Sequence, residues 1–152
     1  MLALQGDVRE HLAMLRGLGS DAVPVRRPSE LADVDGLVLP GGESTTMSKL
    51  ARTFDLLDPL RQAAKDGLPM FGTCAGMILL ADRIEGGVRD QETIGGLDVV
   101  ATVATGPATG RIVAVRQGHL LATSFHPEVT GDDRIHALFV DLVRETASES
   151  AG

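Results

Sequence analysis

The stretch Pro69–Gly76, Pro-Met-Phe-Gly-Thr-Cys-Ala-Gly, constrains the fold most, because an apolar run ends there and a helix-like run begins. It holds Cys74, the only cysteine among 152 residues, with Gly72 and Gly76 two positions away on either side. This G-x-C-x-G pattern is typical of a nucleophile elbow, a strained turn whose neighbours must lack bulk so that the next helix can pack closely. We therefore expect a strand to end at Cys74 and a helix to follow it.

A thiol at this position lies at a helix N-terminus, where unpaired N–H groups and the helix dipole favour the thiolate. The N–H of Ala75 is then directed toward any oxyanion that forms there. The alternative is a buried structural cysteine, which is the usual role of a lone cysteine. Two flanking glycines at a strand-to-helix junction favour the functional interpretation.

Size and composition exclude several classes of protein. At 152 residues and 43% hydrophobic, residues 1–152 predict a single globular domain with a substantial core. A net charge of −7, from 14 basic and 21 acidic residues, argues against nucleic-acid and anionic-membrane partners. A single cysteine excludes an intramolecular disulfide and a cysteine-based metal cluster, so we expect a cytoplasmic protein. We predict no membrane span, no metal and no cofactor.

Strand-like and helix-like segments alternate along the first half of the chain, which predicts an α/β fold with a parallel sheet covered by helices. The expected strands are 1–5, 22–25, 36–40 and the run into Cys74. The expected helices are one that begins at Asp7 and stops at Gly19, one that follows the loop 41–46 and ends at about Phe54, and two over 58–66 and 75–80.

The second half of the chain gives a weaker signal from about Glu85, with one or two strands expected over Leu97–Val103. Two apolar runs, Arg111–Val115 and Leu120–Ser124, are joined by Gln117-Gly118, which predicts a hairpin. A final helix follows. The apolar residues expected on its inner face have helical spacing: Ile135, Leu138, Phe139, Leu142 and Val143.

A cysteine nucleophile needs a base, and the chain has four histidines. We expect His11 and His136, both in helices, to serve packing or solvent-facing roles, and His119 beside the hairpin turn to be exposed.

His126 closes an apolar strand and precedes Pro127 and Glu128. In an extended segment residues two apart face the same side, so Glu128 can orient one ring nitrogen while the other faces the thiol of Cys74. A surface His-Pro turn is the better interpretation of His126 alone. Together with Glu128 and Cys74, a catalytic triad is favoured.

The loop Pro40–Ser44, Pro-Gly-Gly-Glu-Ser, follows a strand and precedes a helix. Glycines there let the backbone approach a ligand, and amide N–H groups at a helix start attract negative charge. We interpret the N–H groups of Gly42 and Ala75 as an oxyanion hole. A phosphate-binding loop is disfavoured because the G-K-[ST] ending is missing and Lys49 comes too late.

Four strings together resemble the class I (triad) glutamine amidotransferases, and more narrowly the PdxT family, the glutaminase subunits of pyridoxal 5′-phosphate synthase. The strings are Leu4–His11 (L-Q-G-D-V-R-E-H), Leu39–Met47 (L-P-G-G-E-S-T-T-M), Phe71–Gly76 (F-G-T-C-A-G) and Ser124–Glu128 (S-F-H-P-E). The elbow and H-P-E alone indicate only the superfamily. The first two strings narrow the resemblance to this subunit.

The resemblance implies a flavodoxin-like three-layer sandwich with a mostly parallel central sheet and a C-terminal antiparallel hairpin. It implies Cys74 as nucleophile, His126 as acid and base, Glu128 as its orienting group, and glutamine held at Gly42, Glu43 and Ser44. The expected products are glutamate and ammonia.

The resemblance also implies that the ammonia passes through a channel to a (β/α)₈-barrel synthase in a large hetero-oligomer. That partner builds the cofactor from ribose 5-phosphate and glyceraldehyde 3-phosphate. The Gln5-Gly6 loop and the first helix are expected to face it.

The resemblance has a gap between Val100 and Ala101, where the family carries an R-N-x-F-G and an I-R-A-P string tied to glutamine recognition. If this segment has been lost, we expect the triad to remain and glutamine binding to be impaired. Alternatively, the sequence joins two stretches across an omitted segment. We favour omission, because strands lost from a packed sheet leave unpaired edges.

Two other functions stay open. A different cysteine hydrolase with the same elbow is disfavoured, because the α/β-hydrolases place an acid between nucleophile and histidine in chain order. A non-catalytic docking module is disfavoured by Cys74, His126 and Glu128, while the missing segment favours it.

Overall fold

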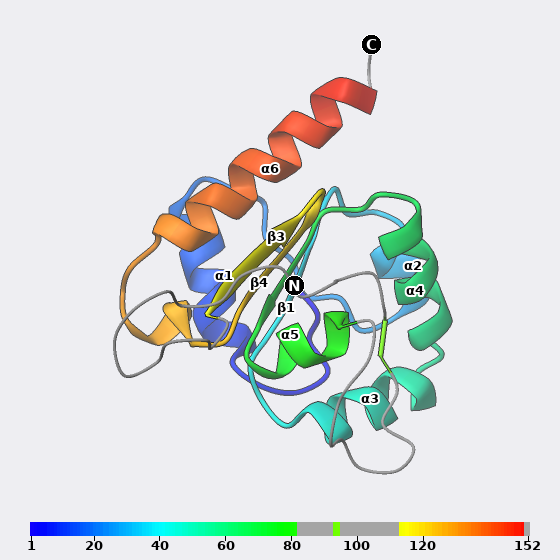
Figure 1. Ribbon diagram of the computed structural model, residues 1–152. Helices are drawn as coiled ribbons and strands as arrows, with labels where there is room; N and C mark the ends of the chain where they lie inside the picture. The colour runs from blue at the N-terminus through cyan, green and yellow to red at the C-terminus, as the bar shows by residue number, and fades with distance from the viewer. Residues whose placement is uncertain (82–92, 95–112, 151–152) are drawn as a thin grey trace.

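The computed structural model describes residues 1–81, 93–94 and 113–150, in which a four-stranded sheet lies between two layers of helices (Figure 1). The strand order is β1 (Leu37–Leu39), β2 (Met70–Thr73), β4 (Leu120–Thr123) and β3 (Ala114–Gln117). β2 pairs in parallel with β1 and with β4, whereas β3 and β4 form an antiparallel hairpin. The predicted flavodoxin-like α/β sandwich is confirmed.

Strands β1, β2 and β4 are buried on both faces, as expected for parallel strands covered by helices, whereas the edge strand β3 is partly exposed. Successive side chains point to opposite faces of the sheet. Leu37, Leu39 and Met70 therefore join one apolar cluster, while Val38 and Phe71 join the other. The sheet thus separates two hydrophobic cores.

One helical layer consists of α1 (Val8–Gly17) and α6 (Arg134–Ser150). The other layer contains α2 (Pro28–Leu31), α3 (Ser44–Thr53), α4 (Leu57–Lys65) and α5 (Ala75–Leu80). Figure 1 shows α1 and α6 on one side of the strands and α3, α4 and α5 on the other. Among the described helices, none has the length and apolar character needed to span a membrane.

Because β1, β2 and β4 run parallel, their carboxyl ends lie at one edge of the sheet. In the register, Thr73 at the end of β2 faces Thr123 at the end of β4. Cys74 follows the first of these residues, and a short 3₁₀ helix, η1 (Pro127–Val129), follows the second. This edge therefore brings together the predicted nucleophile and the predicted base from distant parts of the sequence.

The two short N-terminal strands that we predicted are reduced to one parallel bridge between Leu2 and Val25. The N–H of Leu2 donates to Val38 O at 2.9 Å, so this backbone still extends the sheet beyond β1. Pro24 has no N–H to donate to a ladder, which limits pairing around Val25.

The inner face of α6 differs from the predicted one. Leu138 is 41% exposed, while His136 and Val140 are buried beside Phe139. The buried positions 136, 139 and 140 have the i, i+3, i+4 spacing of one helical stripe, so His136 belongs to the inner face. The strands expected over Leu97–Val103, and the junction at Val100–Ala101, lie outside the described residues.

Candidate active site

Cys74 joins β2 to α5 in a backbone conformation with φ of 48° and ψ of −103°. A positive φ costs a non-glycine residue on the order of 1–3 kcal/mol, and surrounding packing must hold it in place. The strand ends at Thr73 and the helix begins at Ala75, as predicted. The side chain of Cys74 is partly exposed.

The glycines on either side of Cys74 allow α5 to pack directly on the sheet. A Cβ atom on Gly72 would lie 2.5 Å from the carbonyl carbon of Gly76, and one on Gly76 would overlap the Leu39 carbonyl of β1. Neither position has room for a methyl group. The G-x-C-x-G pattern therefore reflects close approach of α5 to β1 and β2, the reason we gave for it.

His126 and Glu128 form a hydrogen bond of 2.8 Å between Nδ1 and Oε1. The side chain of Glu128 is fully buried, whereas that of His126 is 35% exposed. We predicted that an extended backbone would bring the pair together, and this was wrong. Pro127 instead begins the 3₁₀ helix η1, whose tight turn places the Glu128 carboxylate next to the imidazole.

A hydrogen bond joins the backbone of Cys74, the predicted nucleophile, to the strand that precedes His126, the predicted base. The N–H of Cys74 donates to Thr123 O at 2.8 Å, and His126 lies three residues beyond Thr123. The ring of His126 also packs against Gly41, where an added Cβ would overlap the ring carbon Cε1. Cys74, His126 and the glycine loop therefore belong to the same edge of the sheet.

The Glu128 carboxylate stays ionised in the folded protein. Burial alone raises its pKa, but the adjacent His11 imidazole, the N–H of Glu128 itself and the His126 ring outweigh burial and lower the pKa to about 2. Glu128 therefore presents a negative charge to His126 at any neutral or mildly acidic pH.

The glycine loop carries the second predicted oxyanion donor. Gly42 has a φ of 154° and packs against the side chain of Gln5, whose Oε1 accepts the N–H of Glu43 at 2.9 Å. Among the described residues, the N–H groups of Gly42 and Ala75 have no hydrogen-bond acceptor. The side chain of Gln5 therefore links the N-terminal loop to the backbone of this loop.

The carboxylate of Glu43 caps the N-terminus of α3. It accepts the N–H groups of Thr45 and Thr46 at 3.0 and 2.7 Å. The Thr46 hydroxyl and these two N–H groups lower the pKa of Glu43 to about 2. Ser44 begins α3. Glutamine binding by Gly42, Glu43 and Ser44 stays a prediction.

Four residues that were not predicted to belong to this site lie near it: Asp7, His11, Thr73 and His136. Asp7, which precedes α1, lies 3.2 Å from His126 Nδ1. His11 and His136 are fully buried and lie 2.8 Å apart, and His11 also lies 3.2 Å from Thr73 Oγ1. The sequence does indicate that the two histidines are buried, because each falls within the apolar stripe of an amphipathic helix.

We predicted that His119 is exposed, but its side chain is partly buried. Its Nε2 lies 2.8 Å from Ala64 O, at the end of α4. This contact anchors the β3–β4 turn to the helical layer, far from the candidate site in the fold.

Among the described residues, Asp7, His126 and Glu128 have ligand atoms within 4.8 Å of one another. The Nδ1 atom of His126, which a metal would use here, is already hydrogen-bonded to Glu128. A metal bound through this nitrogen would have to displace that hydrogen bond.

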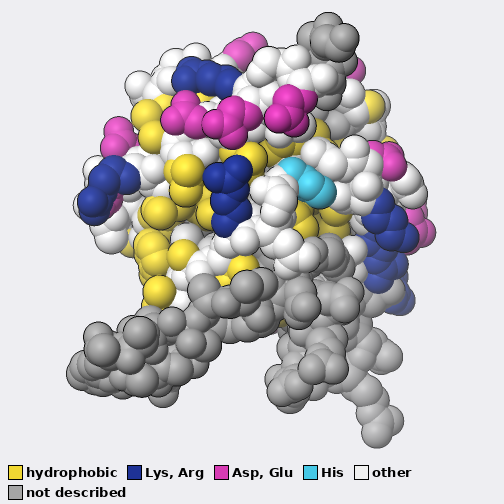
Figure 2. All heavy atoms as spheres, turned by 45° about the horizontal axis from the view of Figure 1, so that its top comes forward, with side chains coloured by type: hydrophobic (Ala, Val, Ile, Leu, Met, Phe, Trp, Pro, Cys, Tyr) yellow, Lys and Arg dark blue, Asp and Glu magenta, His cyan; other side chains and the backbone are white. Residues whose placement is uncertain are grey.

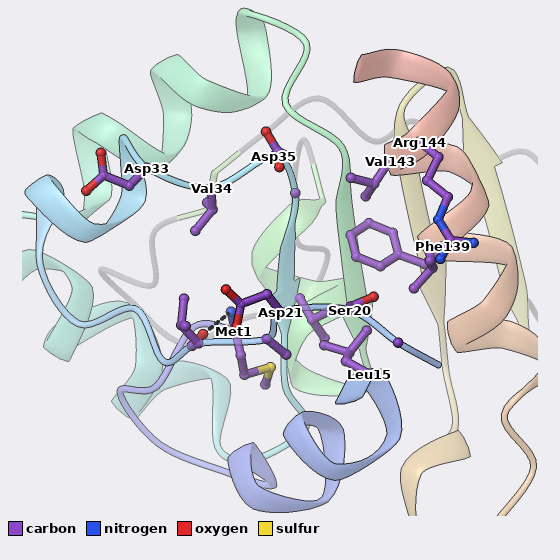
Figure 3. Close-up of a pocket in the computed structure, with 16 residues that line it drawn as sticks. Met1, Leu15, Ser20, Asp21, Asp33, Val34, Asp35, Phe139, Val143 and Arg144 are labelled. Atoms are coloured by element: carbon purple, nitrogen blue, oxygen red, sulfur yellow. Dashed lines mark hydrogen bonds between the residues drawn. The ribbon is translucent and has the colours of Figure 1, made fainter. Parts of the chain in front are cut away.

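A cavity of about 480 Å³ lies near the amino end of β1, away from the candidate site. Figure 3 shows Phe139 and Val143 of α6 on one side of it and Met1 on another. Figure 2 views this end of the molecule, where apolar side chains lie between acidic and basic ones. None of the predicted site residues lines this cavity.

Comparison with known proteins first defines the class. The model of the SNO glutamine amidotransferase family matches residues 1–106 and 89–145. A crystal structure of a glutamine amidotransferase is similar with a TM-score of 0.81 and 34% identity, covering 93% of this chain and 96% of that one. The chain belongs to the SNO glutamine amidotransferase family.

Curated relatives narrow this class to proteins named pyridoxal 5′-phosphate synthase subunit PdxT, which confirms the predicted resemblance. Those from Nocardioides sp. (strain ATCC BAA-499 / JS614), Kineococcus radiotolerans and Nocardia farcinica are 55%, 50% and 49% identical to this chain. The alignments cover 95%, 95% and 100% of this chain and 95%, 94% and 88% of the relatives.

These three alignments are longer than the chain itself. They run over 191, 194 and 199 positions, whereas this chain has 152 residues. Each relative therefore has residues without a counterpart here. That they fall at Val100–Ala101 stays a prediction.

Proposed function

We propose that this chain is the glutaminase subunit of a pyridoxal 5′-phosphate synthase, hydrolysing L-glutamine and supplying ammonia to a synthase partner. The observation that carries the proposal is the buried, ionised Glu128 hydrogen-bonded to His126, at the sheet edge that also holds the strained Cys74 turn. The similarity to PdxT subunits over nearly the full chain supports the same function.

In the first half-reaction, His126 Nε2 takes the thiol proton of Cys74, the sulfur attacks the side-chain amide carbon of glutamine, and the C–N bond breaks. His126 transfers a proton to the departing nitrogen, which leaves as ammonia, and a thioester joins Cys74 to the glutamyl group. Glu128 accepts the Nδ1–H of His126 and thereby leaves Nε2 for proton transfer.

In the second half-reaction, water attacks the thioester carbonyl with His126 Nε2 as general base. Glutamate and the free thiol of Cys74 are the products. Negative charge develops on the carbonyl oxygen in both halves, and the N–H groups of Gly42 and Ala75 stabilise it. Loss of one such donor costs on the order of 3 kcal/mol of activation free energy.

The partner in this proposal is a (β/α)₈-barrel synthase in a large hetero-oligomer that receives the ammonia through a channel. Docking at the Gln5-Gly6 loop and α1 would act directly on the site, because Gln5 holds the backbone of Glu43 beside Gly42. We therefore expect low glutaminase activity for the isolated subunit. The lone cysteine nucleophile must stay reduced, which favours the cytoplasm.

The test is glutamate release from L-glutamine with and without the synthase subunit. The unmodified protein should release glutamate, faster with the partner, and Cys74→Ala should release none while keeping its circular dichroism spectrum. Equal rates for Cys74→Ala and the unmodified protein contradict the mechanism. High activity without the partner contradicts only the gating.

A non-catalytic docking module is the second candidate, favoured by the residues that the relatives have and this chain lacks. A glutamine analogue that alkylates thiols separates the two. Labelling of Cys74 that excess glutamine prevents supports the enzyme, and complex formation without labelling supports the docking module.

A further inference from the structure

A chain of buried polar side chains leads from α6 through α1 to the carboxylate of Glu128. His136 Nε2 lies 2.8 Å from His11 Nδ1. His11 Nε2 lies 3.2 Å from Thr73 Oγ1 and 3.5 Å from Glu128 Oε2. The side chains of His11 and Glu128 are fully buried, and both histidine rings pack on Phe71. Two buried imidazoles inside an apolar core need a reason, because burying a polar group carries a free-energy cost.

The unpaired atoms in this row of buried polar side chains determine which ring nitrogens carry the protons. Within the described residues, the buried side-chain atoms without a hydrogen-bond partner are His136 Nδ1 and Glu128 Oε2. If the proton of His136 were on Nδ1, the orphan would be a buried N–H donor, which proteins tolerate least. With the proton on Nε2, the orphan is a lone pair. We infer that His136 Nε2–H donates to His11 Nδ1.

This donation places the proton of His11 on Nε2, the nitrogen that faces Thr73 and Glu128. The Nε2–H of His11 then donates to Thr73 Oγ1 and also lies near the second carboxylate oxygen, Oε2, at 3.5 Å, where its partial positive charge faces the carboxylate. His126 Nδ1–H donates to the other oxygen, Oε1. Burial and the nearby His11 lower the pKa of His136 to about 4, so His136 is neutral at pH 7 and keeps this arrangement.

We propose that His11, oriented by His136, is a positioning residue for Glu128: it places an N–H against Oε2 and so sets the basicity of His126. This inference rests on the proposed glutaminase function. His11 reaches no substrate, because its side chain is fully buried. It acts through the carboxylate, because an N–H beside Oε2 makes Glu128 a weaker acceptor for His126.

Other titratable groups also lie close to His126 and His136. Asp7, before α1, lies 3.2 Å from His126 Nδ1, and Asp133, before α6, raises the pKa of His136 against the effect of burial. The thiol of Cys74 is a further ionisable group at the same edge of the sheet, so the titration is carried out in a Cys74→Ala background.

The chain offers a matched pair of substitutions at His11. The amide nitrogen of glutamine takes the place of imidazole Nε2, whereas the shorter asparagine side chain reaches only to the place of Nδ1, where its Oδ1 accepts the Nε2–H of His136. His11→Gln therefore keeps an N–H toward Glu128, and His11→Asn keeps only the contact with His136. Both variants leave a polar side chain at this buried position, so both are expected to fold.

The experiment measures the pKa of His126 by NMR titration of histidine Cε1–H resonances in the Cys74→Ala background. In His11→Asn the carboxylate loses the N–H that lies near Oε2 and holds the His126 proton more strongly, so the pKa of His126 should rise by about half a unit or more. In His11→Gln it should stay within about 0.2 units of its original value. His136→Leu removes the side chain that orients His11, so in this variant the pKa of His126 should rise by an intermediate amount.

Turnover gives a second reading with Cys74 present. His11→Asn should lower kcat roughly tenfold, with KM changed less than about twofold, because substrate contacts are intact. His11→Gln should recover most of that loss. An unchanged pKa of His126 in His11→Asn, or equal shifts in both variants, overturns the proposal. The titration needs no turnover, so an inactive unmodified protein would count against the glutaminase function alone.

Discussion

His126 lies beside two carboxylates that differ in burial. Glu128 is fully buried and hydrogen-bonds Nδ1 at 2.8 Å, while Asp7 is 40% exposed and lies 3.2 Å from the same atom. A buried carboxylate interacts more strongly with a protonated imidazole than a solvated one, because water screens the second. Glu128 should therefore dominate the orientation and charge of His126.

We expect Glu128→Gln to lower kcat for glutamine hydrolysis by about a hundredfold or more, because the amide cannot hold the imidazolium that forms during catalysis. Asp7→Asn should lower kcat much less. Steady-state glutamate release in the presence of the synthase subunit measures both. A larger loss in Asp7→Asn would mean that the half-exposed carboxylate is the orienting group.

At the scale of elements, the junction of β2 and α5 depends on backbone contact. Gly72 and Gly76 meet across the Cys74 turn, and Gly76 also meets the carbonyl of Leu39 in β1. A side chain at Gly76 would push α5 away from two strands at once and disturb the N–H of Ala75. Stability and site geometry are therefore coupled at this helix.

Gly76→Ala should lower the free energy of unfolding by roughly 1–3 kcal/mol, the usual penalty for overpacking a core. Gly17→Ala is the matched control: Gly17 closes α1 with open space around its Cα, and alanine there should stabilise by a few tenths to about 1 kcal/mol. Urea denaturation of both variants gives the comparison. Equal stabilities would show that α5 can shift without cost.

At the scale of the whole molecule, the sheet brings α1 and α6, the first and last helices, against the same core. The His11–His136 contact joins them 125 residues apart in the sequence. Titration of the buried His136 is therefore linked to global unfolding.

The stability of the protein should fall on acidification in two ranges of pH. His136 has a pKa of about 4 when folded and an ordinary value of 6.5 when unfolded. The unfolded chain thus binds the extra proton between these values, and the free energy of unfolding drops by roughly 3 kcal/mol as pH falls from 6.5 to 4. Glu128, with its lowered pKa, adds a further loss between about 4.5 and 2.

Chemical denaturation at pH 7, 6, 5 and 4 measures the first range. His136→Gln cannot titrate but keeps an N–H toward His11, so its stability should change less between pH 6.5 and 4. Parallel pH dependence of the two proteins would show that the His136 pKa is not lowered by folding.

Much of the local structure could be predicted because it follows from spacing along the chain. The alternation of apolar runs and amphipathic helices predicted the covered parallel sheet, and Gly72 and Gly76 predicted the tight turn at Cys74. His126 and Glu128 were predicted to meet, although the backbone between them is a 3₁₀ turn and not a strand.

What the sequence by itself determined is therefore the order of elements, the sharp turn at Cys74 and the pairing of His126 with Glu128, since each depends on residues close together in the chain. Only the tertiary structure decided that His11 and His136 meet behind Glu128, that Gln5 reaches Glu43, and that Leu138 faces outward. These contacts depend on how helices rotate against a sheet. That rotation is set by the packing of both cores together, and no local spacing encodes it.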